Sequence, residues 1–217
     1  MRNLEPGSIF SFQIRAGEFA FARIMLNIQF QCLDSSRVAP DSPLREMQND
    51  ILIDVYRDTS AGELPSGRTV LVSGILTSGR FVERGTWKIC GRQQVDPSEV
   101  SFPERLAIDT ISRSKFTQGE VVLPVKISME ETERIDVIPR SLPAITLGEV
   151  VLYQLGRKQE IKNPRLSDVE LRSLARYDLR FSQHRSRVFE CLDLDPDQSY
   201  YERARALGYD LARFYGS

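Results

Sequence analysis

Hydrophobic and polar residues alternate through much of the N-terminal part of the chain. In residues 9–14, Phe10, Phe12 and Ile14 occupy every second position, and a second segment rich in phenylalanine, residues 19–24, follows after a short turn. A period of two is typical of a β-strand that buries one face. We therefore predict an antiparallel hairpin over these two segments, whose aromatic side chains mainly fill a core.

Short apolar segments separated by turn residues continue this pattern. Residues 51–56, 70–76 and 86–89 are predicted strands, whereas the polar, proline-containing residues 34–49 are predicted to form a loop. The last of these strands holds Trp87, the sole tryptophan, which we expect in the core rather than at a recognition surface. The strands together predict a small antiparallel barrel or a strongly curved sheet.

The pentapeptide GEVVL occurs twice, at residues 119–123 and at residues 148–152. We interpret the two copies as two β-strands that are each entered through a glycine. An internal repeat is the less favoured interpretation, because the residues around the two copies do not match.

The last quarter of the chain has a helical character. After Ser167, apolar residues recur at the spacing of a helix. Residues 187–192 favour a strand. A closing helix follows, which Asp197 or Ser199 can cap and which continues through Ala206.

These patterns predict an α+β protein with a β-rich N-terminal half and helices toward the C-terminus. No low-complexity linker interrupts the sequence, so we expect a single α+β domain over residues 1–217. Residues 1–110 form its β-rich part in this interpretation, and residues 111–217 form a mixed β/α extension.

Composition and charge exclude several classes of protein. The chain is 41% hydrophobic and 27% charged, with a net charge of -1 and a pI of about 6.0, so it lacks the basic character of a nucleic-acid-binding protein. No apolar run is long enough for a membrane span, and no secretory signal is visible. The odd number of cysteines, Cys32, Cys90 and Cys191, favours free thiols in a reducing cytoplasm.

The sequence holds no recognisable catalytic or cofactor-binding motif. The patterns CxxC, HExxH, GxxxxGK[ST], GxGxxG and GxSxG are all absent. The single histidine, His184, lies among arginines, where a solvated surface position is expected, and metal or nucleophilic sites need several converging groups. We expect no metal, no cofactor and no enzymatic activity.

Two acidic clusters remain as candidates for binding a partner. Such clusters are most often solvated turns or helix starts, and the functional alternative is an acidic patch for a basic partner. The second cluster lacks the glycine and the closing glutamate of a calcium loop. Two tyrosines follow it and are possible anchors of an interface. The candidate partner-binding residues are Glu130, Glu131, Glu133, Asp193, Asp195, Asp197, Tyr200 and Tyr201.

A basic stretch, residues 176–187, interleaves arginines with aromatic residues. Arginines beside aromatic rings can bind nucleic acid. Acidic residues lie nearby, however, and the whole chain is slightly acidic. We therefore favour a helix surface whose apolar side packs inward.

An ordered set of segments in the N-terminal half is similar to a known family. These segments are PGSIFSFQI, GEFAFARIM, ILIDVYRD, VLVSGILTSGRF, GTWKICGR and SFPERL. Their order and spacing resemble the immunity protein 26 family of bacterial polymorphic-toxin systems. The chain departs from that family at Ala22, where glycine is frequent, and in residues 34–49, which resemble an insertion. Residues from about 111 onward do not match it.

This resemblance implies a cytoplasmic protein that binds and neutralises a cognate toxin, without catalytic residues of its own. The implied partner is a toxin domain, not nucleic acid or a membrane. If the toxin is a nuclease, its basic substrate-binding face would meet acidic residues of this chain. Two alternatives stay open: a β-barrel adaptor that binds a small ligand or nucleic acid, and a hydrolase with an unrecognised carboxylate site.

Overall fold

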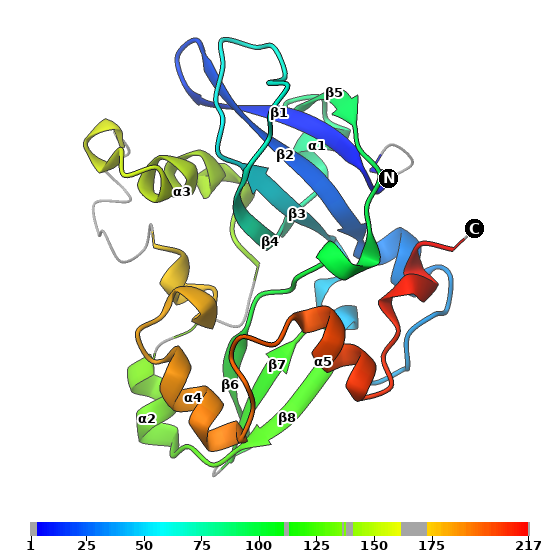
Figure 1. The fold of residues 1–217 in the computed structure, drawn as a ribbon, viewed down its shortest axis with the longest axis vertical. Helices are drawn as coiled ribbons and strands as arrows, with labels where there is room; N and C mark the ends of the chain where they lie inside the picture. The colour runs from blue at the N-terminus through cyan, green and yellow to red at the C-terminus, as the bar shows by residue number, and fades with distance from the viewer. Residues whose placement is uncertain (1–3, 111–112, 136, 138–140, 162–172, 217) are drawn as a thin grey trace.

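The computed structural model of the protein describes residues 4–110, 113–135, 137, 141–161 and 173–216 (Figure 1). The strands are β1 (Ser8–Arg15), β2 (Glu18–Asn27), β3 (Asp50–Tyr56), β4 (Val70–Ser78), β5 (Lys88–Arg92), β6 (Arg105–Thr110), β7 (Arg113–Gln118) and β8 (Val121–Val125). The α-helices are α1 (Arg80–Glu83), α2 (Met129–Ile135), α3 (Leu147–Gln154), α4 (Arg185–Leu192) and α5 (Tyr200–Ala206). Short 3-10 or π-helical turns connect them, among them η2 (Pro43–Met47), η5 (Lys158–Glu160) and η9 (Leu179–Phe181).

The first five strands form one antiparallel sheet in the order β4-β3-β2-β1-β5. The predicted hairpin is its centre, with Phe10 opposite Ala22 and Phe12 opposite Ala20, so a large ring on one strand faces a methyl group on the next. Within the described residues the sheet does not close on itself, and β4 and β5 are its edges (Figure 1). The predicted α+β class is confirmed, with an open sheet in place of a barrel.

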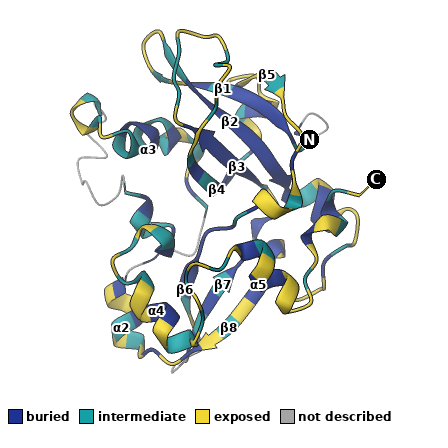
Figure 2. Ribbon diagram, viewed as in Figure 1, coloured by how far each residue is buried: buried dark blue, intermediate teal, exposed yellow. Residues whose placement is uncertain are grey.

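Aromatic residues of the hairpin fill cores on both faces of this sheet. On one face Phe10 stacks on Trp87, with ring centroids 5.0 Å apart and planes 3° from parallel. Phe21 is fully buried on the other face. Phe10, Phe12 and Trp87 are buried as predicted, and Ile14 is half-buried (Figure 2). Trp87 itself lies just before β5, which begins at Lys88.

Helix α3 covers the face of the sheet that carries Phe10. The predicted strand at residues 148–152 is wrong, because this segment forms most of α3. Leu147, Val150 and Val151 are buried at a spacing of three and four residues and pack on the sheet. The other GEVVL copy leads into β8, so the two copies adopt different structures and form no repeat.

The second sheet has the order β6-β7-β8, and helices α2 and α4 pack on one of its faces. The predicted strand at residues 187–192 is also wrong, because these residues belong to α4. Val188 and Phe189 point to the sheet, and Phe189 meets Phe116 of β7 edge-on, with centroids 5.5 Å apart. Burial of these apolar residues between helix and sheet favours the helical form.

Helix α5 begins where the sequence predicts. Ser199 caps it: its hydroxyl accepts from the Glu202 backbone N–H, and the Glu202 carboxylate accepts from the Ser199 N–H. The helix ends at Ala206, as expected. The helix predicted to start after Ser167 falls mostly outside the described residues.

The connection between the two sheets is fastened to the first sheet at two points. Gly74 of β4 has a φ of 63° and lies so close to Ser101 that a Cβ would stand 2.1 Å from the Ser101 carbonyl oxygen, which requires glycine here. Nearby, the buried Arg23 pairs with Asp54 at 3.3 Å and with Glu99 at 2.9 Å. These contacts fix where β6 starts.

An ionic cluster ties the turn of the hairpin to the end of α3. Arg157 donates to both carboxylate oxygens of Glu18, at 2.8 and 2.9 Å, and Thr59 donates to the same carboxylate at 2.6 Å. Arg157 also pairs with Glu160. The hydrogen bonds from Arg157 and Thr59 lower the pKa of Glu18 to about 2.

Replacing the stacked ring should destabilise the fold strongly. We expect Phe10→Ala to lower the free energy of unfolding by about 3–5 kcal/mol, because it leaves a cavity beside Trp87. Chemical denaturation followed by Trp87 fluorescence measures this loss. Phe30→Ala is the control, since Phe30 is 60% exposed and should change stability by less than about 0.5 kcal/mol. Equal losses for both variants would contradict the assigned core.

The Glu18 cluster predicts a defined pH dependence. Because the folded pKa of Glu18 lies below its ordinary value, its stabilising effect is complete above that ordinary value, 4.5, and is lost as the pH falls toward 2. The stability difference between the wild type and Glu18→Gln should therefore be largest at neutral pH and shrink between about pH 5 and 2. Denaturation midpoints across this range test it, with the exposed Glu5→Gln as control. A constant difference would contradict the assignment.

Candidate functional site

Helix α2 presents the first acidic cluster to solvent. Glu130 and Glu133 are exposed, and Glu130 pairs with Arg134 one turn along the helix. Glu131 is less exposed and pairs with Arg187 of α4 at 3.4 Å. Thr132 and Ile135 are buried against the second sheet, so the opposite side of the helix carries the carboxylates.

The second acidic cluster forms the connection from α4 to α5. Asp193 ends α4 in the left-handed conformation, with a φ of 55°, and Asp195 and Asp197 follow in a turn. The Asp195 carboxylate accepts from the Asp197 backbone N–H at 2.9 Å. All three aspartates are exposed. We call residues 193–197 the acidic loop.

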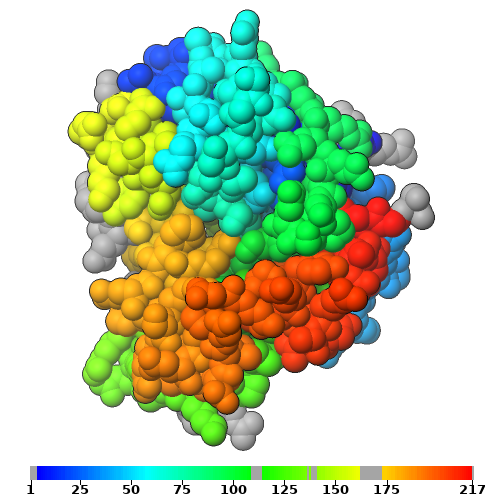
Figure 3. Space-filling model, viewed as in Figure 1, coloured from blue at the N-terminus to red at the C-terminus, as the bar shows by residue number. Residues whose placement is uncertain are grey.

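The structure brings the two clusters onto one part of the surface. Helix α4 leads into the acidic loop and contacts α2, since its Arg187 pairs with Glu131 of α2 and lies 3.8 Å from Glu190 of its own helix. Figure 3 shows α4 and the acidic loop in orange on the surface, next to α2 in yellow-green. Carboxylates more than fifty residues apart in sequence thus lie on neighbouring elements, with Glu190 of α4 between them. We call the carboxylates of α2, α4 and the acidic loop the acidic surface.

Two arginines hold the backbone of the acidic loop from beneath. Arg185, at the start of α4, donates to the Pro196 carbonyl at 2.7 Å. Arg203 of α5, which is 2% exposed, donates to the carbonyls of Asp195 at 3.3 Å and Gln198 at 2.9 Å. The carbonyls therefore point inward to cations, while the aspartate carboxylates remain at the surface.

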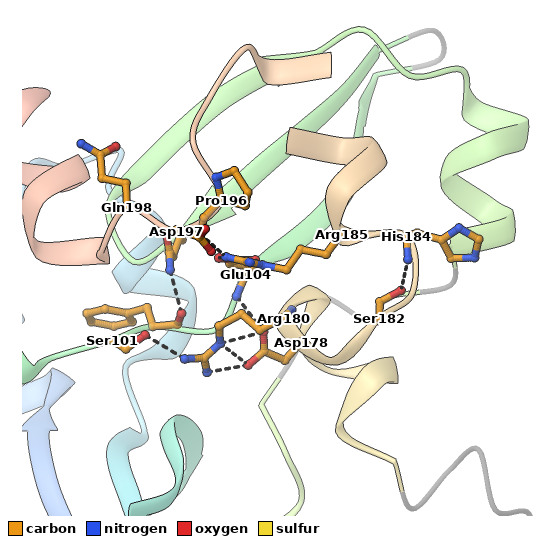
Figure 4. A network of polar contacts seen from close by, with 12 residues as sticks. Ser101, Glu104, Asp178, Arg180, Ser182, His184, Arg185, Pro196, Asp197 and Gln198 are labelled. Carbon is orange, nitrogen blue, oxygen red and sulfur yellow. Dashed lines mark hydrogen bonds and ion pairs between the residues drawn. The ribbon is translucent and has the colours of Figure 1, made fainter. Parts of the chain in front are cut away.

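Glu104 anchors Arg185 in the interior (Figure 4). Arg185 donates to both oxygens of the Glu104 carboxylate, at 2.7 and 2.8 Å. Glu104 is 1% exposed, and this ion pair raises the pKa of Arg185. The acidic loop is thus connected through one side chain to the start of the second sheet.

Arg180 fastens the preceding segment to the first sheet. It pairs with Asp178 and donates to Ser101 Oγ at 2.7 Å and to the Ser73 carbonyl at 2.8 Å (Figure 4). Asp178 in turn accepts from the Glu104 backbone N–H at 3.1 Å. The sequence predicts a helix surface for the basic stretch, but α4 begins only at Arg185 and residues 179–181 form the turn η9. Its arginines Arg180 and Arg185 pair inward and position the acidic surface.

The two candidate tyrosines differ in their surroundings. Tyr200 is 3% exposed and packs edge-on against Phe102, with centroids 5.0 Å apart. Its hydroxyl accepts from the Glu120 backbone N–H at 3.3 Å, and burial raises its pKa. Tyr201 is half-buried beside the same core. In this conformation Tyr201 is the one of the pair that can reach a partner.

Several residues that build the site were missed by the sequence analysis. Glu190 was overlooked because its segment was interpreted as a strand, and a helical interpretation would have placed it one turn before the acidic loop. Glu104 carries no local sequence signal, since its role depends on Arg185, 81 residues away. Arg203 binds carbonyls 5 and 8 residues away, but it is also held by Gln118, 85 residues away.

The geometry of the site favours binding. Among the described residues, no three histidine, cysteine or carboxylate side chains come together in a way that could hold a metal ion. His184 precedes α4, and its backbone N–H donates to Ser182. Cys32, Cys90 and Cys191 are unpaired. What the site offers is a group of exposed carboxylates on a fixed backbone.

Comparison with known proteins identifies the class. A family model described as Immunity protein 26 matches residues 5–117, more than half of the chain. No curated protein and no solved structure matches the chain significantly. The protein is thus an immunity protein by class, and the chain belongs to the Immunity protein 26 family. Each helix among the described residues is too short or too polar to cross a lipid bilayer.

Removing an arginine that binds the backbone of the acidic loop should make the loop less ordered. We expect Arg203→Met to lower the free energy of unfolding by about 1–3 kcal/mol, because it removes the hydrogen bonds to the Asp195 and Gln198 carbonyls and the one to the buried Gln118 side chain. The Asp197 amide should also exchange faster with solvent. Hydrogen-exchange NMR measures both effects, with the exposed Arg205→Met on the same helix as control. Unchanged exchange at Asp197 in the Arg203 variant would contradict the assigned support.

Proposed function

We propose that this protein neutralises a cognate toxin by binding it through the acidic surface on α2, α4 and the acidic loop. The residues proposed for contact are Glu130, Glu131, Glu133, Asp193, Asp195, Asp197 and Tyr201, and the buried Tyr200 is proposed to support them. The observation that carries the proposal is the convergence of two distant acidic clusters on one supported surface. Family membership supplies the class of partner.

The charge of this surface favours a basic face on the toxin. Complementary charges speed the encounter of two proteins and suppress wrong partners, more than they add to affinity. A toxin that acts on nucleic acid has such a basic face, and covering it would block access of the substrate. The proposed mode of action is therefore occlusion, without catalysis by this chain, in the cytoplasm of a bacterium that competes through polymorphic toxins.

Tight binding also needs an apolar anchor, because exposed ion pairs contribute only about 0–1 kcal/mol each. Tyr201 is half-buried at the start of α5, four residues after Asp197. A tyrosine in this position can lose its remaining exposure on binding. Tyr200 would contribute from beneath, by supporting the backbone from which Tyr201 projects.

Removing the charge of the acidic loop should slow association with the toxin. The triple variant Asp193→Asn, Asp195→Asn and Asp197→Asn retains the oxygen that accepts from the Asp197 amide. We expect its association rate to fall about tenfold at low ionic strength and to depend less on salt. Stopped-flow or surface-based kinetics with the purified cognate toxin domain, at two salt concentrations, measure both effects.

A matched control carries the same change of charge elsewhere. Glu5, Asp34 and Glu63 are exposed carboxylates of the N-terminal half, and their triple replacement by amides should alter the rate much less. If the two triple variants slow association equally, the effect comes from net charge, and the proposed surface is wrong. Binding by wild type without protection from the toxin in cells would overturn the proposed occlusion.

A further inference from the structure

The second sheet has an open face opposite the one that α2 and α4 cover. Arg105 lies opposite Thr117, and Ala107 opposite Lys115, so the four side chains share this face. Residues 39–47, from the loop after β2, stand over it, and Tyr209 lies at its edge. Together they enclose a cleft of about 340 Å³. This volume is at the small end of the range for ligand sites.

Arg105 is a buried cation at the wall of this cleft. It is 4% exposed, and its Nε atom has no hydrogen-bond acceptor. Within the described part of the chain its guanidinium forms no ion pair. Burial lowers its pKa, and the negative charges of Asp178, Asp50 and Glu46 oppose this effect. An arginine fork normally holds a carboxylate or phosphate through two parallel hydrogen bonds.

The rest of the cleft restricts which anion can enter. Asp41 and Glu46 line it, are exposed, and form no ion pair among the described residues. Glu120 also lines it, but Arg213 neutralises that carboxylate. Lys115 lines the same cleft as a second cation. A simple anion would be attracted to Arg105 and Lys115 and repelled by the carboxylates of Asp41 and Glu46. A molecule with a carboxylate at one end and an ammonium group at the other satisfies both charges.

We propose that this cleft binds a small zwitterion of the amino-acid type. Its carboxylate pairs with Arg105, and its ammonium group faces Asp41 and Glu46. The site lies on the face of the second sheet away from α2 and α4, and it is independent of the proposed toxin surface. An experiment can therefore contradict the proposed ligand site without contradicting the proposed toxin surface, and the reverse.

The experiment titrates the purified full chain with each of the common L-amino acids, and with acetate, methylammonium and inorganic phosphate, up to about 10 mM. Binding is followed by calorimetry and by amide shifts of Ala107 and Thr117. We expect at least one amino acid to bind, to shift these amides and to raise the thermal midpoint. Acetate and phosphate should bind at least about tenfold more weakly.

Variants identify the groups involved. Arg105→Met should abolish binding, because it removes the group proposed to pair with the carboxylate, and a cooperative thermal transition of the variant shows that it still folds. Glu46→Gln should weaken amino-acid binding without strengthening methylammonium binding. Glu63→Gln, an exposed carboxylate elsewhere, is the control and should leave binding unchanged.

Three results would overturn the proposal. If no probe binds, solvent satisfies Arg105 and the cleft is not a ligand site. If phosphate or acetate binds as well as any amino acid, the site binds oxyanions in general, and Asp41 and Glu46 do not contribute to binding. If no amino acid binds but Arg105→Met weakens binding to the toxin domain, the arginine belongs to the protein interface.

Discussion

The buried ion pair between Glu104 and Arg185 is the contact on which the C-terminal half depends. Glu104 lies in the connection between the sheets, and Arg185 begins α4. The Glu104 backbone N–H donates to the Asp178 carboxylate, and the Glu104 carbonyl accepts from the Leu179 N–H. Glu104 therefore fixes both the segment before α4 and the helix itself. Because the carboxylate is almost fully buried, loss of either partner would leave an uncompensated charge in the interior. This is why the position of α4, and of the acidic loop beyond it, is tightly specified.

In the acidic loop, positive charges lie below the backbone and negative charges lie at the surface. Arginines lie beneath the acidic loop and bind its carbonyls, while the aspartate carboxylates face water. A surface loop usually loses conformational entropy when a partner binds it. Here much of that ordering already exists in the free protein, because donors from both flanking helices fix the backbone. The carboxylates can therefore act as a fixed pattern of charge, which suits discrimination among related partners more than raw affinity.

Sequence reasoning recovered the parts of this structure that depend on local signals. The alternation in β1 and the cap at Ser199 are local, and both were predicted correctly. The segments at 148–152 and 187–192 were wrongly predicted as strands from their β-branched and aromatic residues. Their apolar positions nevertheless recur at helical spacing, as at Leu147, Val150 and Val151. The inward pairing of Arg180 and Arg185 had no local signal, because it requires Ser101 and Glu104 from another part of the chain.

The second sheet has a consequence for how the chain is divided into parts. The family match ends at residue 117, inside β7, whose pairing with β8 lies beyond that limit. Phe116, the last buried aromatic residue within the match, is covered by Phe189 of α4. The limit of sequence similarity is thus not a limit of folding. A chain cut there would lose the neighbour of β7 and expose a hydrophobic sheet face, so the shared family segment of this protein is completed by residues that the family model does not contain.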